Sequence, residues 1–272
     1  MVVLKKLEYL QKQLEIYLHE GVVIAFSGGV DSAFLLWISE EVRKQSGGNL
    51  VALTTQSASM PLHDREDAKQ FIQYLNVPHV WKNSQELTLP KYKINDSNRC
   101  YYCKSELFRI AKEVAKERNY RRILYGYSAS DTQDFRPGHI AAADNKILSP
   151  LEDAGFLKEE IRYIMRKQKL KISEKPASPC LSSRIMTGIS VTQKRLEDID
   201  ALETLLRQEG LNILRVRIDQ KRNIPMLRIE VSPSEMFKII ELRERLIEEG
   251  KKRGYRWITL DLEGYRMGGG ND

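Results

Sequence analysis

The hydrophobic pattern of residues 1–170 alternates between strand-like and helix-like segments. Residues 22–26 (Val-Val-Ile-Ala-Phe) form a continuous apolar run, which is typical of a strand buried on both faces of a parallel sheet. Apolar residues at helical spacing precede and follow this run. Further strands are predicted at residues 50–55, 79–81 and 122–126, and further helices at residues 68–75, 103–119 and 156–168. This alternation predicts an α/β domain with a mostly parallel sheet.

The pattern changes at residues 173–180, where two prolines predict an ordered loop. Helical and strand-like segments then follow in the order α-β-β-α-β, at residues 196–206, 213–218, 226–231, 237–247 and 257–262. Such a run predicts a smaller α+β domain. We therefore divide the chain into a domain of residues 1–175, a linker loop of residues 176–191 that carries Cys180, and a C-terminal domain of residues 192–272.

Composition narrows the class of protein. Of the 272 residues, 42% are hydrophobic and 30% are charged, which excludes a disordered chain. The apolar runs are far shorter than the ~20 residues of a membrane span. We expect a soluble, cytoplasmic protein without a membrane partner. The net charge of +7 lies almost wholly in the first 184 residues and is compatible with nucleotides or RNA, without choosing between them.

A glycine-rich turn, Ser27-Gly28-Gly29-Val30-Asp31-Ser32, joins the first strand to the next helix. Gly28 and Gly29 let the backbone approach an anion closely, and Ser27 and Ser32 supply hydroxyl donors. The helix that follows offers its N-terminal N–H groups and the positive end of its dipole. Asp31 suits a magnesium ion that bridges to the phosphates. The turn predicts a phosphate-binding loop, and a turn without a ligand is the alternative.

The three cysteines, Cys100, Cys103 and Cys180, are odd in number and too few for a disulfide framework. A helix would place Cys100 and Cys103 on one side, because they are three residues apart. Spacing alone leaves three explanations near parity: packing, zinc, and three irons of a [4Fe–4S] cluster whose fourth iron stays open. No histidine lies at zinc-motif spacing, and no thioredoxin-like segment surrounds the Cys-x-x-Cys pair.

Motifs spread over the whole chain carry a family resemblance. Besides the phosphate loop they are YGYSASD at residues 125–131, DFRPG at 134–138, ASPCLSSR at 177–184, RVR at 215–217, GYRWITLDL at 254–262 and GYR at 264–266. Taken together they resemble the LarE family of PP-loop sulfur transferases. The resemblance implies a PP-loop ATP pyrophosphatase fold for residues 1–175. It implies that the C-terminal domain binds substrate and forms a homo-oligomer.

The same resemblance implies a reaction. The enzyme uses ATP and Mg²⁺ to adenylate the carboxylates of pyridinium-3,5-dicarboxylic acid mononucleotide. Sulfur then displaces AMP and leaves thiocarboxylates, on the route to the nickel-pincer nucleotide cofactor of lactate racemase. A carboxylate resists attack by a nucleophile, and AMP turns its oxygen into a good leaving group. The expected partners are ATP, the pyridinium mononucleotide and a sulfide donor.

Cysteine content separates two kinds of family member. One kind has a single cysteine, at the position of Cys180, and sacrifices its own sulfur. The other has three cysteines that hold a [4Fe–4S] cluster. Because Cys100, Cys103 and Cys180 are all present, the chain resembles the cluster kind.

The resemblance also implies nucleotide contacts outside the phosphate loop. They are Lys104 after the cysteine pair, and Gly126, Asp131 and Arg136 in a second loop. The alternatives are an ordinary helix-surface lysine for Lys104 and loop capping for Asp131.

The resemblance implies that three arginines hold the phosphate of the mononucleotide substrate: Arg184, Arg215 and Arg217. Arg215 and Arg217 share one face of a predicted strand, and arginine suits bidentate contact with phosphate. Glu203 matches an acidic position of the family. The alternative for all of these residues is a solvated surface.

Three rival functions stay open. A tRNA thiolase fits the basic N-terminal part, but the extra zinc-finger cysteines common in the thiouridine class are missing, so nucleic acid is not the expected partner. An ammonia-fed, amide-forming PP-loop ligase needs none of the cysteines. A nucleotide-binding or metal-binding module without catalysis releases no pyrophosphate.

Overall fold

The computed structural model describes residues 2–131, 137–222 and 224–266, and the chain divides into two units. The first comprises Met1–Ser57, Leu62–Glu86 and Cys100–Ser178, and the second Ala58–Pro61, Leu87–Arg99 and Pro179–Asp272. No helix among the described residues is both long and apolar enough to cross a membrane.

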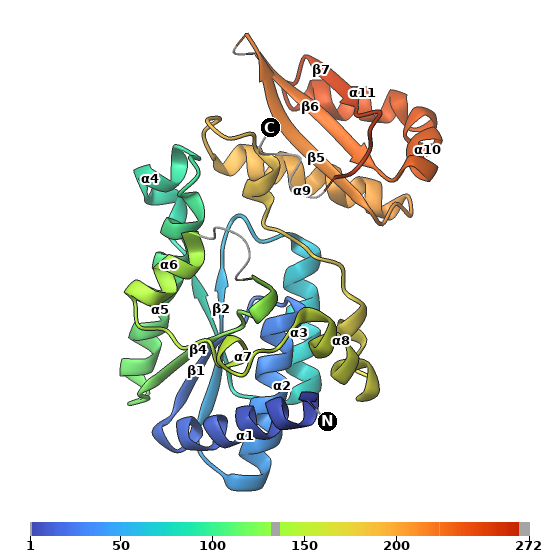
Figure 1. Cartoon of the computed structure of the whole chain (residues 1–272). Helices are drawn as coiled ribbons and strands as arrows, with labels where there is room; N and C mark the ends of the chain where they lie inside the picture. The colour runs from blue at the N-terminus through green and yellow to red at the C-terminus, as the bar shows by residue number, and fades with distance from the viewer. Residues whose placement is uncertain (1, 132–136, 223, 267–272) are drawn as a thin grey trace. The chain divides into compact units, whose positions relative to one another are not determined.

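A four-stranded parallel sheet forms the centre of the first unit (Figure 1). Its order is β3-β2-β1-β4, with bounds Val22–Ala25 for β1, Leu50–Gln56 for β2, His79–Asn83 for β3 and Arg122–Tyr125 for β4. All four residues of β1 are buried, as its continuous apolar run predicts. The α/β prediction is confirmed, and the carboxyl ends of the four strands share one edge of the sheet.

Helices cover both faces of this sheet (Figure 1). On one face α5 packs Ile110, Ala111 and Val114 against side chains of β1 and β2. The other helices of the unit are α1 (Val2–Glu20), α2 (Val30–Ser46), α3 (Leu62–Leu75), α6 (Pro137–Asp144), α7 (Pro150–Asp153) and α8 (Lys158–Lys167), and α5 itself spans Arg99–Glu117. Because α5 leads back to the start of β4, its first turn lies at the carboxyl edge of the sheet.

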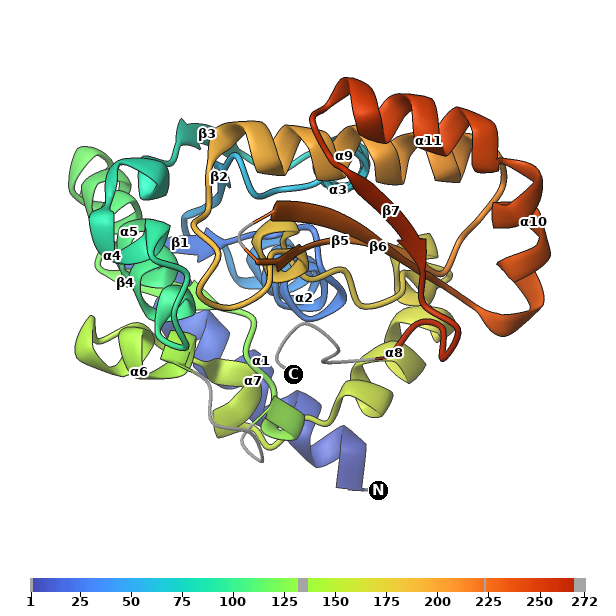
Figure 2. The same ribbon diagram turned by 90° about the horizontal axis from the view of Figure 1, so that it is seen from above.

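The second unit contains a three-stranded sheet of order β5-β6-β7, and α9 and α11 lie along it (Figure 2). The bounds are α9 Gln193–Gln208, β5 Leu214–Lys221, β6 Ile224–Val231, α10 Met236–Glu241, α11 Arg243–Lys252 and β7 Trp257–Leu260. The prediction of one helix over 237–247 is wrong, because the helix breaks at Leu242, whose φ is −83° and ψ 2°. No glycine or proline marks this break, so hydrophobic periodicity does not reveal it.

Residues 87–99 leave the first unit and pack in the second, around the short helix α4 (Pro90–Lys93). Asn95 is fully buried there, and its Nδ2 donates hydrogen bonds to the carbonyls of Ile185, Met186 and Ile189 at 3.2, 2.9 and 2.9 Å. This segment is contiguous with Cys100 in sequence. The division predicted from the sequence counted it with residues 1–175.

Candidate functional site

The glycine-rich loop leaves the carboxyl end of β1 and enters α2. Gly28 has a φ of +74°, a conformation that favours glycine. A Cβ at this position would lie 3.1 Å from the Cβ of Ala68 and 3.2 Å from the carbonyl oxygen of Asp64. The backbone of the loop therefore packs directly on α3, where a larger residue would push it away.

The two serines of the loop have different roles in its structure. Ser32 is buried, and its Oγ donates to the carbonyl of Gly29 at 3.0 Å and lies 3.0 Å from the Oγ of Ser27. Ser27 is exposed, and Asp31 is half-buried in the first turn of α2. Ser32 thus holds the shape of the loop, while Ser27 and Asp31 are accessible to a ligand at the positive end of a 17-residue helix.

Gly126 brings the end of β4 against this loop. A Cβ on Gly126 would lie 2.6 Å from the backbone nitrogen of Ser32 and 2.8 Å from the carbonyl carbon of Asp31. Only glycine fits such a backbone contact without a shift. The second loop predicted to meet nucleotide therefore adjoins the phosphate loop at the same edge of the sheet.

Asp131 is buried and organises this second loop. Its carboxylate accepts a hydrogen bond from the Oγ of Ser128 at 2.9 Å, and the Nζ of Lys158 lies 2.6 Å from its Oδ1. This arrangement is the loop cap that stood as the alternative to a nucleotide contact. Arg136, the other residue predicted for this loop, lies outside the described residues.

Lys104 and two of the cysteines lie in the first turns of α5. Cys100 is exposed, and Cys103 is half-buried. Lys104 is also half-buried. Its side chain lies close to Gly138, at the start of α6, where an added Cβ would be 3.0 Å from the Cγ of Lys104. None of the three cysteines forms a disulfide in the described chain. No group of three or more cysteine, histidine or carboxylate side chains among the described residues is arranged to hold a metal ion.

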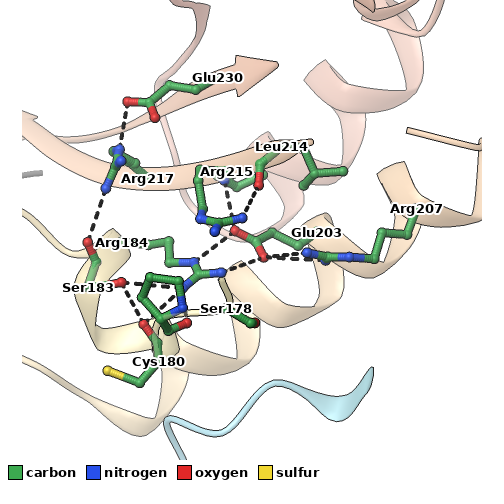
Figure 3. Close-up of polar contacts among 12 residues, drawn as sticks. Ser178, Cys180, Ser183, Arg184, Glu203, Arg207, Leu214, Arg215, Arg217 and Glu230 are labelled. Atoms are coloured by element: carbon green, nitrogen blue, oxygen red, sulfur yellow. Dashed lines mark hydrogen bonds and ion pairs between the residues drawn. The ribbon is translucent and has the colours of Figure 1, made fainter. Parts of the chain in front are cut away.

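Cys180 belongs to the second unit and is half-buried, in a loop held by a buried arginine (Figure 3). Arg184 has no exposed surface. Its Nε and Nη2 donate to the two carboxylate oxygens of Glu203 at 3.0 and 3.2 Å. Its Nη1 donates to the carbonyls of Pro179 and Cys180, the latter at 3.0 Å. Arg184 therefore joins the backbone at Cys180 to α9.

Glu203 is the centre of this buried network. Besides the Arg184 guanidinium, it accepts the backbone N–H of Val216 at 3.1 Å and lies 3.3 Å from the guanidinium of Arg207. Burial by itself would raise the pKa of Glu203, but the neighbouring charge of Arg184 holds that pKa below its usual range. The carboxylate can therefore stay charged although it is buried, because positive groups pair with it.

The other two arginines predicted for substrate phosphate are also buried. Arg217 donates to Glu230 at 2.6 Å and to the carbonyl of Ser183 at 3.1 Å (Figure 3). Arg215 stacks over the ring of Tyr265, and burial lowers its pKa, helped by the charge of Arg184. A solvated face, the alternative for these residues, is therefore wrong.

Arg99 was missed in the sequence analysis. Arg99, the first residue of α5, donates through Nη1 to the side-chain oxygen of Asn95 and, at 2.8 Å, to the carbonyl of Ser182. The hydrogen bond joins the residue before Cys100 to a residue two positions after Cys180. An arginine beside a lone Cys-x-x-Cys pair was the only signal in the sequence.

Comparisons with known proteins indicate the family. A family profile described as NAD synthase matches residues 2–134. An uncharacterised protein of Synechocystis sp. is 36% identical over 252 residues, which cover 92% of this chain and 91% of that protein. The pyridinium-3,5-bisthiocarboxylic acid mononucleotide synthase of Lactiplantibacillus plantarum is 27% identical over 253 residues, 93% of this chain and 90% of the synthase. The chain belongs to the LarE family of PP-loop proteins.

Membership of the LarE family indicates an enzyme that uses ATP, with Mg²⁺, in a sulfur-transfer role. A probable sulfurtransferase of Methanocaldococcus jannaschii is a further relative, 28% identical over 191 residues, 62% of this chain and 54% of that protein. The family assignment accounts for the phosphate loop. It leaves the substrate, the source of sulfur and the homo-oligomer as predictions.

Proposed function

We propose that this chain is an ATP-dependent sulfur transferase that converts the carboxylates of pyridinium-3,5-dicarboxylic acid mononucleotide into thiocarboxylates. The observation that carries the proposal is the hydrogen bond from Arg99 to Ser182, which within the second unit joins the residue before Cys100 to the chain just after Cys180. The relative from Lactiplantibacillus plantarum, whose name specifies the bisthiocarboxylic acid product, supports the choice of substrate.

The phosphate loop serves the activation step. A substrate carboxylate oxygen attacks the α-phosphorus of ATP, and pyrophosphate leaves with the electrons of the broken P–O bond. The N-terminal turn of α2 and the Ser27 hydroxyl stabilise the phosphate charge, since their donors are fixed before the reaction. Asp31 is accessible and has the hard oxygen ligands that Mg²⁺ prefers. Lys104 is proposed to meet the same phosphates.

The thiols serve the second step. Their donor set consists of sulfur alone, which is the chemistry that an iron–sulfur cluster requires, and Cys100, Cys103 and Cys180 would hold it. When bound with one iron unligated by protein, the cluster would supply a place for sulfide. Attack of sulfide on the acyl carbon forms the C–S bond, breaks the C–O bond to the phosphate and releases AMP.

The arginines of β5 serve substrate binding. Arg215 and Arg217 are proposed to hold the phosphate of the mononucleotide. Burial and the repulsion of Arg184 lower the pKa of Arg215, and the negative charge of a phosphate beside it would offset both effects. Arg184 donates to protein acceptors through all three nitrogens of its guanidinium. We therefore propose that it holds the loop of residues 179–184, the Cys180 loop, and does not bind the phosphate.

The test is an anaerobic assay with ATP, the pyridinium mononucleotide and sulfide, read by mass spectrometry of the product and by pyrophosphate release. We expect thiolated product from the wild type, and pyrophosphate without thiolation from Cys180→Ala. Thiolation that survives replacement of all three cysteines would contradict the proposal. Thiolated tRNA in place of thiolated nucleotide would support the tRNA thiolase, and amide product with ammonia would support the ligase.

A further inference from the structure

Three arginines hold the backbone of the Cys180 loop. Arg184 donates to the carbonyls of residues 179 and 180, Arg99 to that of residue 182, and Arg217 to that of residue 183. All three arginines belong to the second unit, Arg184 in the linker loop and Arg217 in β5. Arg99 differs from the other two because it is the residue directly before Cys100.

Arg99 is itself held in place. Asn95, which accepts a hydrogen bond from the Arg99 guanidinium, is fully buried and has a φ of +61°. Its amide donates to three carbonyls between residues 185 and 189. The hydroxyl of Tyr92 lies 2.6 Å from the Oγ of Ser182, so a second contact joins the same two stretches. A guanidinium can serve two acceptors in fixed directions, which a lysine ammonium does less well.

We propose that Arg99 is a positioning residue: it holds the chain after Cys180 against the chain before Cys100, so that the thiols are presented to one ligand. The consequence for sulfur transfer rests on the proposed function, but the tie between the stretches does not. A tie of this kind raises the effective concentration of one thiol at another without adding any contact to sulfur. Arg99 touches no reacting atom.

The test uses the full-length protein free of metal, with Cys103→Ala so that Cys100 and Cys180 are the two remaining thiols. The probe is dibromobimane, which becomes fluorescent when it has bridged two thiols within one protein. Arg99→Lys keeps the charge, and Arg99→Gln keeps one donor group. Arg245→Lys is the matched control. Arg245 is an exposed arginine of the second unit, and its Nη1 lies 2.5 Å from the Oε1 of Glu209.

We expect the rate of bridging to fall about fivefold or more in both Arg99 variants and to stay unchanged in Arg245→Lys. Reaction of each thiol alone with iodoacetamide should stay within about twofold, because the thiols themselves are not altered. Circular dichroism and the melting temperature identify any variant that does not fold, and the other Arg99 variant then decides.

Bridging at the wild-type rate in a folded Arg99 variant would overturn the proposal, as would an equal loss in the control. No iron, ATP or substrate enters the measurement, so its outcome is separate from that of the thiolation assay. Fast bridging that depends on Arg99, in a protein that does not thiolate, would leave Arg99 in its role and refute the proposed function.

Discussion

The phosphate loop and the Cys180 loop are built in opposite ways. The phosphate loop consists of backbone and small side chains: Gly28 lies against α3, and Gly126 lies against the first turn of α2. The Cys180 loop depends on long, charged side chains, and its central pair, Arg184 and Glu203, has no exposed surface. The residues that shape the first loop from within, Ser27 to Ser32, are adjacent in sequence, while the side chains that hold the second come from residues far apart along the chain. The difference predicts unequal responses to substitution.

The largest effect should come from Glu203→Ala. Removing this carboxylate leaves the Arg184 guanidinium buried without its partner, which costs about 3–5 kcal/mol of unfolding free energy. Denaturant unfolding followed by circular dichroism measures it. Glu209→Ala, which breaks the exposed pair with Arg245, should cost no more than about 1 kcal/mol. Equal costs would show that burial does not distinguish the two pairs.

Gly126→Ala should come next. The added Cβ would lie 2.6 Å from the backbone nitrogen of Ser32, so the loop must shift, at a cost of about 1–3 kcal/mol. We expect weaker ATP binding in calorimetry as well. Gly47→Ala introduces a Cβ where nothing lies within 4 Å, at a φ of +80°, and so isolates backbone strain. An unchanged ATP affinity in Gly126→Ala would mean that the two loops do not form one site.

The Cys180 loop should also respond to pH. The folded-state pKa of Glu203 lies below its ordinary value of 4.5, so this carboxylate contributes stability above that pH. The contribution is lost as pH falls through the lowered pKa and Glu203 becomes protonated. The difference in unfolding free energy between wild type and Glu203→Gln should therefore shrink below about pH 4. A difference that grows as the pH falls would contradict the direction of the shift.

The smallest effect separates the serines of the phosphate loop. Ser32→Ala removes the hydrogen bond from the buried Ser32 side chain to the Gly29 carbonyl, in addition to the bond to Ser27, and should cost about 1 kcal/mol. Ser27→Ala changes an exposed residue and should stay within about 0.5 kcal/mol, while weakening ATP binding. Thermal melting and calorimetry on the same samples give both quantities. A larger loss of stability in Ser27→Ala would reverse the assigned roles.

The same contrast explains what the sequence could predict. The apolar run of β1 and the glycines after it state the strand, the turn and the anion site within eleven residues, because each depends on its neighbours in the chain. Burial of Arg184 depends on Glu203, nineteen residues away, and nothing in either residue alone distinguishes it from a surface charge. The Arg99–Ser182 bond spans 83 residues and was missed for the same reason.

The central claim is that thiols from two distant stretches of chain hold one iron–sulfur cluster. A crystal structure of anaerobically prepared protein, with data collected at the iron absorption edge, tests it most directly. We predict one anomalous peak of about four irons, three of them bonded to Cys100, Cys103 and Cys180. Iron-free protein after reconstitution, or iron bound without Cys180, would contradict it.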